Sequence, residues 1–226
     1  MTEQPADSKA LWLDLHRSIP DERVRLGRAS SSAYRSDPKM LLFMAARYKF
    51  VAKLLAGRRE VLEVGCGDGF GAPIVAAEVG RLYGTDIDEA TLADNADRLA
   101  FAANLSFEYF DFRAARYPRT LDGLYAVDVL EHIFPDEEQA FVTNLAASLG
   151  ERGVAVFGTP NVTSERYASA YSRQGHVNLK DHATLRATLG RHFHNVFVFS
   201  MNDEVVHTGY YPMAHYLWAL CVDPRA

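Results

Sequence analysis

A short run in the first third of the chain contains residues suited to holding a nucleotide-like ligand. Residues 61–69 read VLEVGCGDG, an apolar stretch followed by three glycines in G-x-G-x-G spacing. Glycines at a strand-to-helix turn let backbone N–H groups approach a ligand beside a helix N-terminus. Asp86 ends a second apolar stretch, RLYGTD, where a carboxylate can accept hydrogen bonds from both hydroxyls of a ribose.

Glu63 lies two residues before the first glycine and limits which ligands the glycine turn can bind. The glycine spacing differs from the G-x-G-x-x-G of dinucleotide sites, and an acid at this position would repel a pyrophosphate. It would suit a ligand that carries an amino group or a positive centre, and S-adenosylmethionine has both. A nicotinamide-dependent oxidoreductase, which must bind nucleotide phosphates, is therefore the disfavoured alternative.

The elements that position these residues alternate between strands and helices. Apolar runs predict strands at residues 61–64, 81–86, 105–110, 123–129, 153–158, 193–201 and 216–222. Capping residues and helical spacing predict helices at residues 38–57, 88–99, 136–149 and 181–190, besides a short one after the glycine turn. This alternation, with short turns, predicts an α/β fold whose parallel sheet is covered by helices on both faces.

Two segments fall outside this alternation. In residues 1–36 a short helix is predicted around Leu11, Trp12 and Leu15, and the stretch 23–32 is expected to be a solvated loop, with a flap over the active site as the alternative. Residues 159–180 are long, polar and aromatic, which is typical of a lid or a binding element. We expect the helix at 38–57 to be scaffold.

Length and composition limit the function classes. The 226 residues are enough for one compact domain with a sizeable core, and the net charge of −5 disfavours a nucleic-acid binder. Two distant cysteines, Cys66 and Cys221, indicate no disulfide scaffold, and no apolar run is long enough for a membrane span. We therefore expect a cytoplasmic protein without nucleic-acid or membrane partners.

Four motifs in order resemble those of class I S-adenosylmethionine-dependent methyltransferases. Residues 63–69 (EVGCGDG) resemble the first motif, residues 84–86 (GTD) fall at the ribose-binding acid, and residues 110–112 (FDF) resemble the third motif. Residues 128–132 (DVLEH) resemble the segment after the fourth strand. The resemblance covers roughly residues 39–222. It implies a Rossmann-like, doubly wound sheet of about seven strands, mostly parallel with an antiparallel last strand.

The resemblance also implies roles for individual residues. The backbone of Gly65 and Gly67 would approach the methionine part of the cofactor, with Glu63 near its amino group. Asp86 would hold the ribose, and Asp111 would accept from the adenine amine, although a turn cap is the plainer role for Asp111. The full set of predicted cofactor-binding residues is Glu63, Gly65, Cys66, Gly67, Asp86, Ile87, Asp111, Phe112 and Asp128.

The reacting end is predicted from two histidines and an acid. Methyl transfer from a sulfonium needs an acceptor held in line, and a hydroxyl acceptor also needs a base. His132 and His176 are the candidate bases, and Glu131 could orient an imidazole or hold a substrate hydroxyl. A histidine at a strand-to-helix junction can also simply bond to the backbone, so this role competes with a structural one.

A metal site is an alternative use of the same residues. Asp128, Glu131 and His132 form an acid-x-x-Glu-His pattern similar to the metal-binding segment of ubiquinone-pathway O-methyltransferases and small-RNA 2′-O-methyltransferases, which usually begin with glutamate. With His176 they could hold a divalent ion that polarises an acceptor hydroxyl. We assign no metal ligands, because the shorter Asp128 departs from the pattern and many relatives with Leu-Glu-His bind no metal.

The expected function is methyl transfer from S-adenosylmethionine to a hydroxyl of a small molecule, sugar or lipid-linked intermediate. N-methylation of a small molecule and a non-catalytic, cofactor-binding partner subunit are the alternatives. We expect residues 37–226 to form one methyltransferase domain with a substrate-side insert at about 159–180, preceded by an N-terminal extension or flap at 1–36. The substrate partner would be a small molecule or glycan, and a homodimer is compatible with the sequence.

Overall fold

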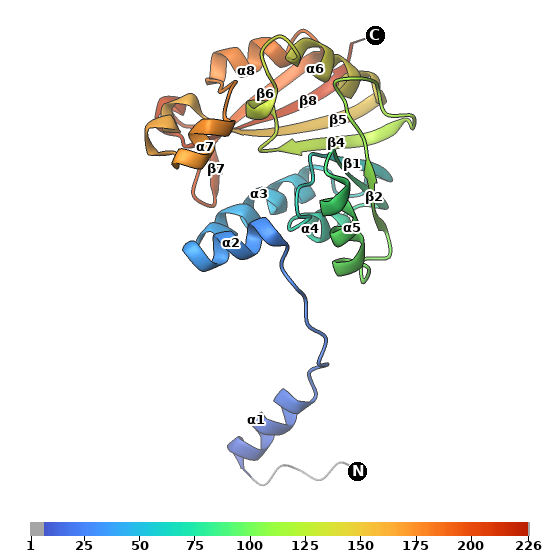
Figure 1. Cartoon of the computed structure of the whole chain (residues 1–226), viewed down its shortest axis with the longest axis vertical. Helices are drawn as coiled ribbons and strands as arrows, with labels where there is room; N and C mark the ends of the chain where they lie inside the picture. The colour runs from blue at the N-terminus through green and yellow to red at the C-terminus, as the bar shows by residue number, and fades with distance from the viewer. Residues whose placement is uncertain (1–6, 226) are drawn as a thin grey trace.

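The computed structural model describes residues 7–225, which form a sheet covered by helices together with an N-terminal arm, residues 7–36 (Figure 1). The strands are β1 (Glu60–Val64), β2 (Arg81–Asp86), β3 (Leu105–Tyr109), β4 (Leu121–Val127), β5 (Leu149–Pro160), β6 (Phe193–Asn202), β7 (Val205–His207) and β8 (Tyr216–Pro224). The α-helices are α1 (Ser8–Arg17), α2 (Arg28–Ser36), α3 (Met40–Leu54), α4 (Ala72–Ala76), α5 (Glu89–Arg98), α6 (Glu138–Ala147), α7 (Ala170–Gly175) and α8 (His182–Leu189). Three short 3-10 helices are η1 (Leu130–His132), η2 (Val162–Tyr167) and η3 (Tyr211–Met213).

The sheet has the strand order β3-β2-β1-β4-β5-β8-β6-β7. Strands β1 to β5 pair in parallel, whereas β8 runs antiparallel to both of its neighbours, β5 and β6. This confirms the predicted Rossmann-like, mostly parallel α/β sheet with an antiparallel last strand. The described residues contain eight strands rather than about seven, because the connection after β6 turns back as the three-residue edge strand β7.

Apolar side chains from the two faces of the sheet form two cores. One contains Leu62 and Leu124 and packs against α6 and α8, and the other contains Val61 and packs against α3 and α4. Successive residues of a strand point to opposite faces, so the neighbours Val61 and Leu62 enter different cores. The continuous apolar runs predicted as strands are therefore buried on both sides, as a parallel sheet requires.

The N-terminal arm differs from the prediction in one respect. The helix predicted around Trp12 is present as α1, which has no buried residue and extends away from the sheet at the end of an irregular segment (Figure 1). The loop predicted over residues 23–32 is wrong from Arg28 onward, where α2 begins and packs against α3. Ser30 in α2 is fully buried rather than solvated.

Residues 159–180 fold back across the carboxyl end of the sheet. After β5 the chain forms η2 and α7 and then returns, so that Asn161 and Lys180 form a parallel bridge. The Asn161 side-chain amide donates to the carbonyl oxygens of Tyr211 and Ala214. The segment is thereby tied to the late connection before β8. Within residues 7–225 no helix has the length and apolar character needed to cross a membrane.

Candidate functional site

The glycine turn after β1 has the backbone shape that only glycine adopts without strain. Gly65, Gly67 and Gly69 have φ angles of 66°, 51° and 68°, in the left-handed region. A Cβ at Gly65 would lie 2.7 Å from a methyl group of Val129, so the Gly65 backbone lies close to the segment that follows β4. A Cβ at Gly67 would meet nothing within 4 Å, because this part of the turn faces open space.

A cavity of about 380 Å³ lies beside this turn, at the carboxyl ends of the first four strands. It is the place where ligands bind in open α/β sheets. We call it the first cavity, and it is lined by Val64, Gly65, Gly67, Asp86, Ile87, Phe110, Asp111, Phe112, Arg113, Asp128, Val129, His132, Ile133, Phe134, Glu137 and Phe141. Eight of the twelve predicted site residues thus meet around one space, although they come from four separate segments.

Asp86 stands at the centre of a set of backbone donors. Its Oδ2 accepts from the Gly67 amide at 2.9 Å, and its Oδ1 accepts from the amides of Ile87 and Asp88. Each carboxylate oxygen can accept more than one hydrogen bond, so hydroxyl groups can still be bound. These bonds hold the carboxylate toward the cavity, next to the exposed side chain of Ile87.

Asp111 combines the two roles considered for it. Its side chain accepts from the Arg113 amide at 2.9 Å, which makes it a turn cap, and it also pairs with the Arg113 guanidinium. The hydrogen bonds from Arg113 hold the pKa of Asp111 below its usual value. Both residues line the first cavity, beside the ring of Phe112.

Glu63 lies behind the glycine turn and is buried, with 1% of its surface exposed. Burial raises the pKa of its carboxyl to about 8, because the charged form loses its hydration. Its Oε2 atom has no hydrogen-bond partner in the described residues. A buried acceptor without a partner suits an approaching positively charged group, which would favour the ionised carboxylate.

Cys66 contributes differently from the other members of the predicted set. Its side chain is buried and contacts Asn95, while its amide donates to the carbonyl oxygen of Thr85. Burial raises the pKa of the thiol well above its usual range, so the thiol is not reactive. Within this turn the groups that face the first cavity belong to Gly65 and Gly67.

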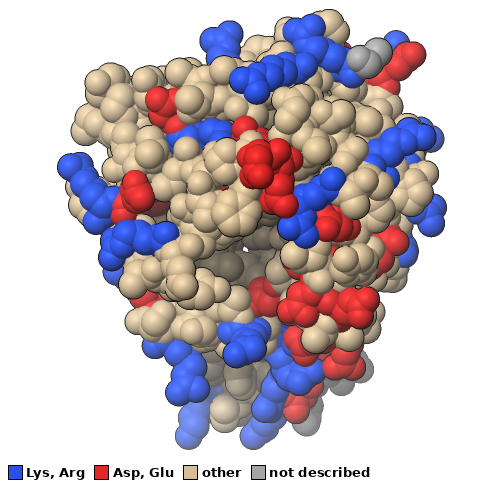
Figure 2. Space-filling view, turned by 45° about the horizontal axis from the view of Figure 1, so that its top comes forward, with Lys and Arg blue, Asp and Glu red and all other residues tan. Residues whose placement is uncertain are grey.

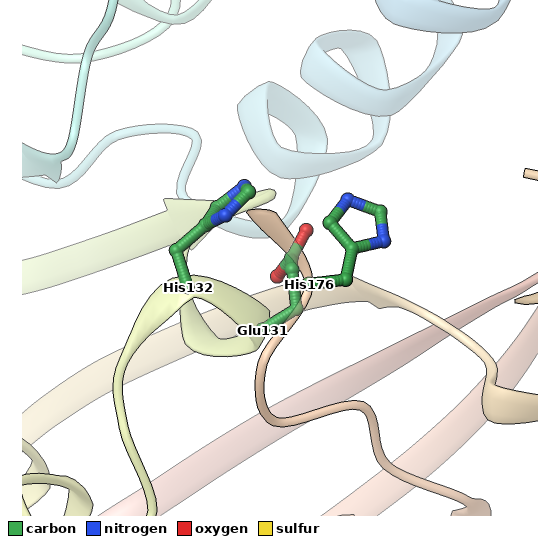
Figure 3. A group of neighbouring side chains, drawn as sticks. All are labelled: Glu131, His132 and His176. Atoms are coloured by element: carbon green, nitrogen blue, oxygen red, sulfur yellow. The ribbon is translucent and has the colours of Figure 1, made fainter. Parts of the chain in front are cut away.

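Glu131, His132 and His176 form one cluster next to the first cavity (Figure 3). One candidate ligand atom from each lies within 4.8 Å of the other two, and the two imidazole centroids are 5.2 Å apart. The carbonyl oxygen of Glu131 accepts from the amides of Val177 and Asn178. These two bonds fix the end of the insert against η1, which brings His176 to His132 from 44 residues away in the sequence.

The acid of this cluster is fully buried. Glu131 Oε2 accepts from the Thr159 hydroxyl at 3.0 Å, whereas Oε1 has no partner among the described residues. Burial, followed by the nearby Asp128 carboxylate, raises the pKa of Glu131 to about 8. Burial and the neighbouring His132 lower the pKa of His176. Both shifts favour the neutral forms of these side chains.

The tautomer of neutral His132 follows from its backbone contact. Its Nδ1 lies 2.9 Å from the carbonyl oxygen of Gly175, and a carbonyl can only accept, so Nδ1 must carry the proton. In the neutral ring Nε2 then keeps its lone pair. The backbone bond that a structural role predicts is therefore present, and it also leaves a basic nitrogen at the first cavity.

A third group is formed by Arg47, Asp128 and Tyr216, of which only Asp128 is a predicted site residue. Arg47 comes from α3, which was expected to be scaffold, and its Nη1 donates to Asp128 Oδ2 at 2.7 Å. Its guanidinium also lies 4.0 Å from the centre of the Tyr216 ring. Asp128 has a φ of 58°, which is rare for a residue other than glycine and typical of functional sites. Asp128 is outside the cluster of Glu131, His132 and His176.

A second cavity, of about 480 Å³, lies on the other side of these residues. It is lined by Arg47, Pro160, Ser164, Glu165, Tyr167, Ala168, Ser172, His176, Leu179, His215 and Tyr216. Most of these residues belong to the insert, and the others come from α3 and the start of β8. Figure 2 shows a hollowed face on which acidic and basic side chains are interspersed, without a continuous basic surface.

Comparisons with known proteins agree with this geometry. A methyltransferase-domain family model matches residues 62–155. A probable S-adenosylmethionine-dependent methyltransferase of Mycolicibacterium smegmatis is 32% identical over 119 residues, which are 51% of this chain and 44% of that protein. The ubiquinone biosynthesis O-methyltransferase of Rickettsia akari is 27% identical over 111 residues, 48% of this chain and 43% of that protein. The chain spans less than half the length of these relatives.

The fold has relatives among solved structures. The N-methyltransferase NodS from Bradyrhizobium japonicum, in complex with S-adenosyl-L-homocysteine, superposes with a TM-score of 0.60 at 18% identity, covering 85% of this chain and 88% of that one. Residues 62–155 are therefore similar to a methyltransferase domain, and the chain has the fold of this solved methyltransferase.

Proposed function

We propose that this protein binds S-adenosylmethionine in the first cavity and transfers its methyl group to a hydroxyl of a small molecule, sugar or lipid-linked intermediate in the second. The observation that supports this best is the arrangement of the two cavities. His132 lines the first cavity, Arg47 and His176 line the second, and Asp128 joins the two through its ion pair with Arg47. A methyl donor and an acceptor in these spaces would meet at the histidines.

The first cavity has the groups that the donor requires. The Gly67 backbone and the Asp86 carboxylate face it, and Ile87, Phe110 and Phe112 supply apolar surface for a flat ring. Glu63 lies behind the glycine turn as a buried acceptor for an amino group. We therefore propose ribose at Asp86, adenine between Ile87 and Asp111, and the amino acid part at the glycine turn.

When bound, S-adenosylmethionine supplies a methyl group that is already activated by a positive sulfur. The protein then has to hold the acceptor in line with that methyl, exclude water and accept the hydroxyl proton. His132 suits the last task, because its Nδ1–H bond to Gly175 leaves Nε2 free to take the proton. His176 and Glu131 would hold the acceptor hydroxyl beside it.

A divalent cation is an alternative use of this cluster, and the residues fit one. Two imidazoles and a carboxylate form a common ligand set, and the unpartnered Oε1 of Glu131 is a buried oxygen without another role in the described residues. Glu131, His132 and His176 would hold the ion, which would lower the pKa of a bound hydroxyl. Asp128, considered earlier as a fourth ligand, instead pairs with Arg47.

Chelator treatment separates these two roles. If His132 acts as a free base, methyl transfer should survive dialysis against EDTA. If the cluster holds a metal, activity should be lost on dialysis and restored by Mg²⁺, Mn²⁺ or Zn²⁺. Binding of S-adenosylhomocysteine should be unchanged in both cases, because the first cavity does not depend on the ion.

The proposed function is tested by titrating the protein with S-adenosylmethionine and S-adenosylhomocysteine in a calorimeter. Both should bind at one site, and mass spectrometry should then detect methyl transfer to hydroxyl compounds offered as acceptors. Failure of both ligands to bind would refute the assignment of the first cavity. Transfer to amines but not to hydroxyls would keep the cofactor and correct the acceptor class, and binding without transfer to any acceptor would favour a non-catalytic partner subunit.

A further inference from the structure

The glycine turn is attached to the N-terminal arm through Asp68, the residue between Gly67 and Gly69. Asp68 Oδ2 accepts from the Ser30 amide at 2.7 Å and from the Ser30 hydroxyl at 2.8 Å. Helix α2 begins after Gly27, which has no side chain to cap it. The carboxylate of Asp68 therefore caps α2 from a different part of the chain, where a negative charge is favourable.

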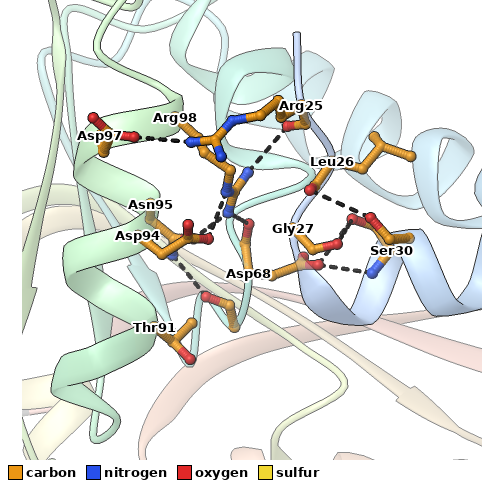
Figure 4. Close-up of polar contacts among 12 residues, drawn as sticks. Arg25, Leu26, Gly27, Ser30, Asp68, Thr91, Asp94, Asn95, Asp97 and Arg98 are labelled. Atoms are coloured by element: carbon orange, nitrogen blue, oxygen red, sulfur yellow. Dashed lines mark hydrogen bonds and ion pairs between the residues drawn. The ribbon is translucent and has the colours of Figure 1, made fainter.

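The contact is tight and is reinforced from a third element (Figure 4). A Cβ at Gly27 would lie 2.4 Å from the Asp68 Cβ, so only glycine fits there. Arg98 in α5, whose side chain is 3% exposed, donates to the carbonyl oxygens of Asp68 at 2.7 Å and Arg25 at 3.3 Å. One buried guanidinium thus bonds both to the glycine turn and to the chain entering α2.

Almost all polar groups of residues 67 and 68 consequently have a hydrogen-bond partner. The Gly67 amide donates to Asp86, and the Gly67 carbonyl oxygen accepts from the Asn95 side chain at 2.7 Å. The carbonyl oxygen and the carboxylate of Asp68 are held by Arg98 and Ser30. Asp68 itself does not line the first cavity. Its hydrogen bonds therefore stabilise the conformation of the turn and do not hold a ligand.

We propose that Ser30 and Gly27 are positioning residues for the cofactor: they hold the turn between Gly67 and Gly69 in the conformation that admits S-adenosylmethionine. This inference rests on the proposed function of the first cavity. Without these contacts the three successive residues of the turn, whose backbone angles are positive or constrained, would sample many conformations. Ordering them when the cofactor binds would reduce the affinity for the cofactor. The segment from Arg25 to Ser30 is therefore a fixed part of the cofactor site and not a flap over it.

The coupling between docking of α2 and binding of the cofactor must act in both directions. If docking of α2 raises the affinity for the cofactor, the bound cofactor must stabilise the docked α2 by the same factor. The Ser30 amide reports this directly, because it is buried and donates to Asp68. Its hydrogen exchange should become slower when S-adenosylhomocysteine is bound.

The test compares Ser30→Ala with Ser32→Ala, the same substitution two residues further along α2 at an exposed position. Calorimetry with S-adenosylhomocysteine should show affinity weakened by about fivefold or more in Ser30→Ala, in the range typical of coupled sites. Affinity in Ser32→Ala should equal that of the wild type. Gly27→Ala is a second variant, which displaces Asp68 sterically and should weaken binding too. In turnover, Ser30→Ala should raise the KM for S-adenosylmethionine and leave kcat nearly unchanged.

Urea unfolding of each variant establishes that it is folded. If a variant does not fold, hydrogen exchange at Ser30 still tests the proposal, because that measurement uses the wild-type protein. Equal affinity of wild type, Ser30→Ala and Gly27→Ala, or a Ser30 amide whose exchange is unaffected by ligand, would overturn the positioning role and leave the cofactor site in place. Absence of binding by the wild type would instead refute the cofactor site, and this inference with it.

Discussion

The two cavities are built in different ways. The first is formed by residues within 64–87 and 110–141, most of which directly follow the parallel strands. The second takes residues from α3, the insert and the start of β8, which lie far apart in the sequence. A site made of local turns can serve one ligand in many proteins. A site made of distant side chains can vary with the acceptor.

The largest effect should follow from His132→Ala, which removes the proposed base. Turnover should fall by about 10²–10⁴-fold, the usual contribution of a general base, while affinity for S-adenosylhomocysteine stays unchanged. The measurement is single-turnover methyl transfer together with calorimetry. His194→Ala, at an exposed histidine, is the matched control. A His132 variant that lost cofactor affinity and kept its turnover number would show that His132 holds the cofactor and is not the base.

Asp86→Ala should act on the first cavity alone. It removes the proposed acceptor for two ribose hydroxyls and also leaves the Gly67 amide without its partner. Hydrogen bonds to a charged group contribute about 1.5–3 kcal/mol each, so affinity for S-adenosylhomocysteine should fall by about 100-fold. Asp14→Ala, on the exposed helix α1, should bind like the wild type. Retained affinity in Asp86→Ala would rule out the ribose position.

Arg47→Met should act on the second cavity. The variant removes the partner of Asp128 and the cation over the Tyr216 ring, while keeping much of the side-chain volume. The KM for the acceptor should rise by about tenfold, as expected for a lost charged contact in a binding site. Lys49→Met, an exposed cation on the same helix, controls for the change in charge. An unchanged acceptor KM with weaker cofactor binding would place Arg47 on the other cavity.

Glu63 should give an effect on stability, which is measured in the absence of ligand. Its pKa is about 8 in the folded protein and near 4.3 when unfolded, so between these values the unfolded state loses its proton first. The free energy of unfolding should therefore fall as pH rises, by up to about 1.4 kcal/mol per pH unit from this group, and level off above pH 8. Urea unfolding of Glu63→Gln from pH 5 to pH 9 should show a shallower slope than the wild type. Equal slopes would mean that Glu63 is ionised in the folded state.

The fold and the first cavity could be predicted because their signals are local. The three glycines, Glu63 and Asp86 occupy 24 consecutive residues, and each strand ends next to the residue that it presents to the ligand. Period and capping were sufficient to predict most of the strands and helices. The short edge strand β7 escaped prediction because three residues show no clear alternation.

The second cavity and the arm could not be predicted because their contacts join distant segments. Arg47 and Asp128 are 81 residues apart, and a helical arginine gives no local sign that it will pair with an acid after β4. The serines of α2 and its uncapped Gly27 favour a loop when only the sequence is considered. The carboxylate that stabilises its first turn comes from Asp68, 38 residues later.

The assignment of the cofactor to the first cavity is tested most directly by titrating wild type, His132→Ala and Asp86→Ala with S-adenosylhomocysteine under the same conditions. Wild type and His132→Ala should bind with equal affinity, and Asp86→Ala should bind about 100-fold more weakly. Absence of binding to the wild type, or equal affinity in all three proteins, would contradict the assignment of the first cavity to the cofactor.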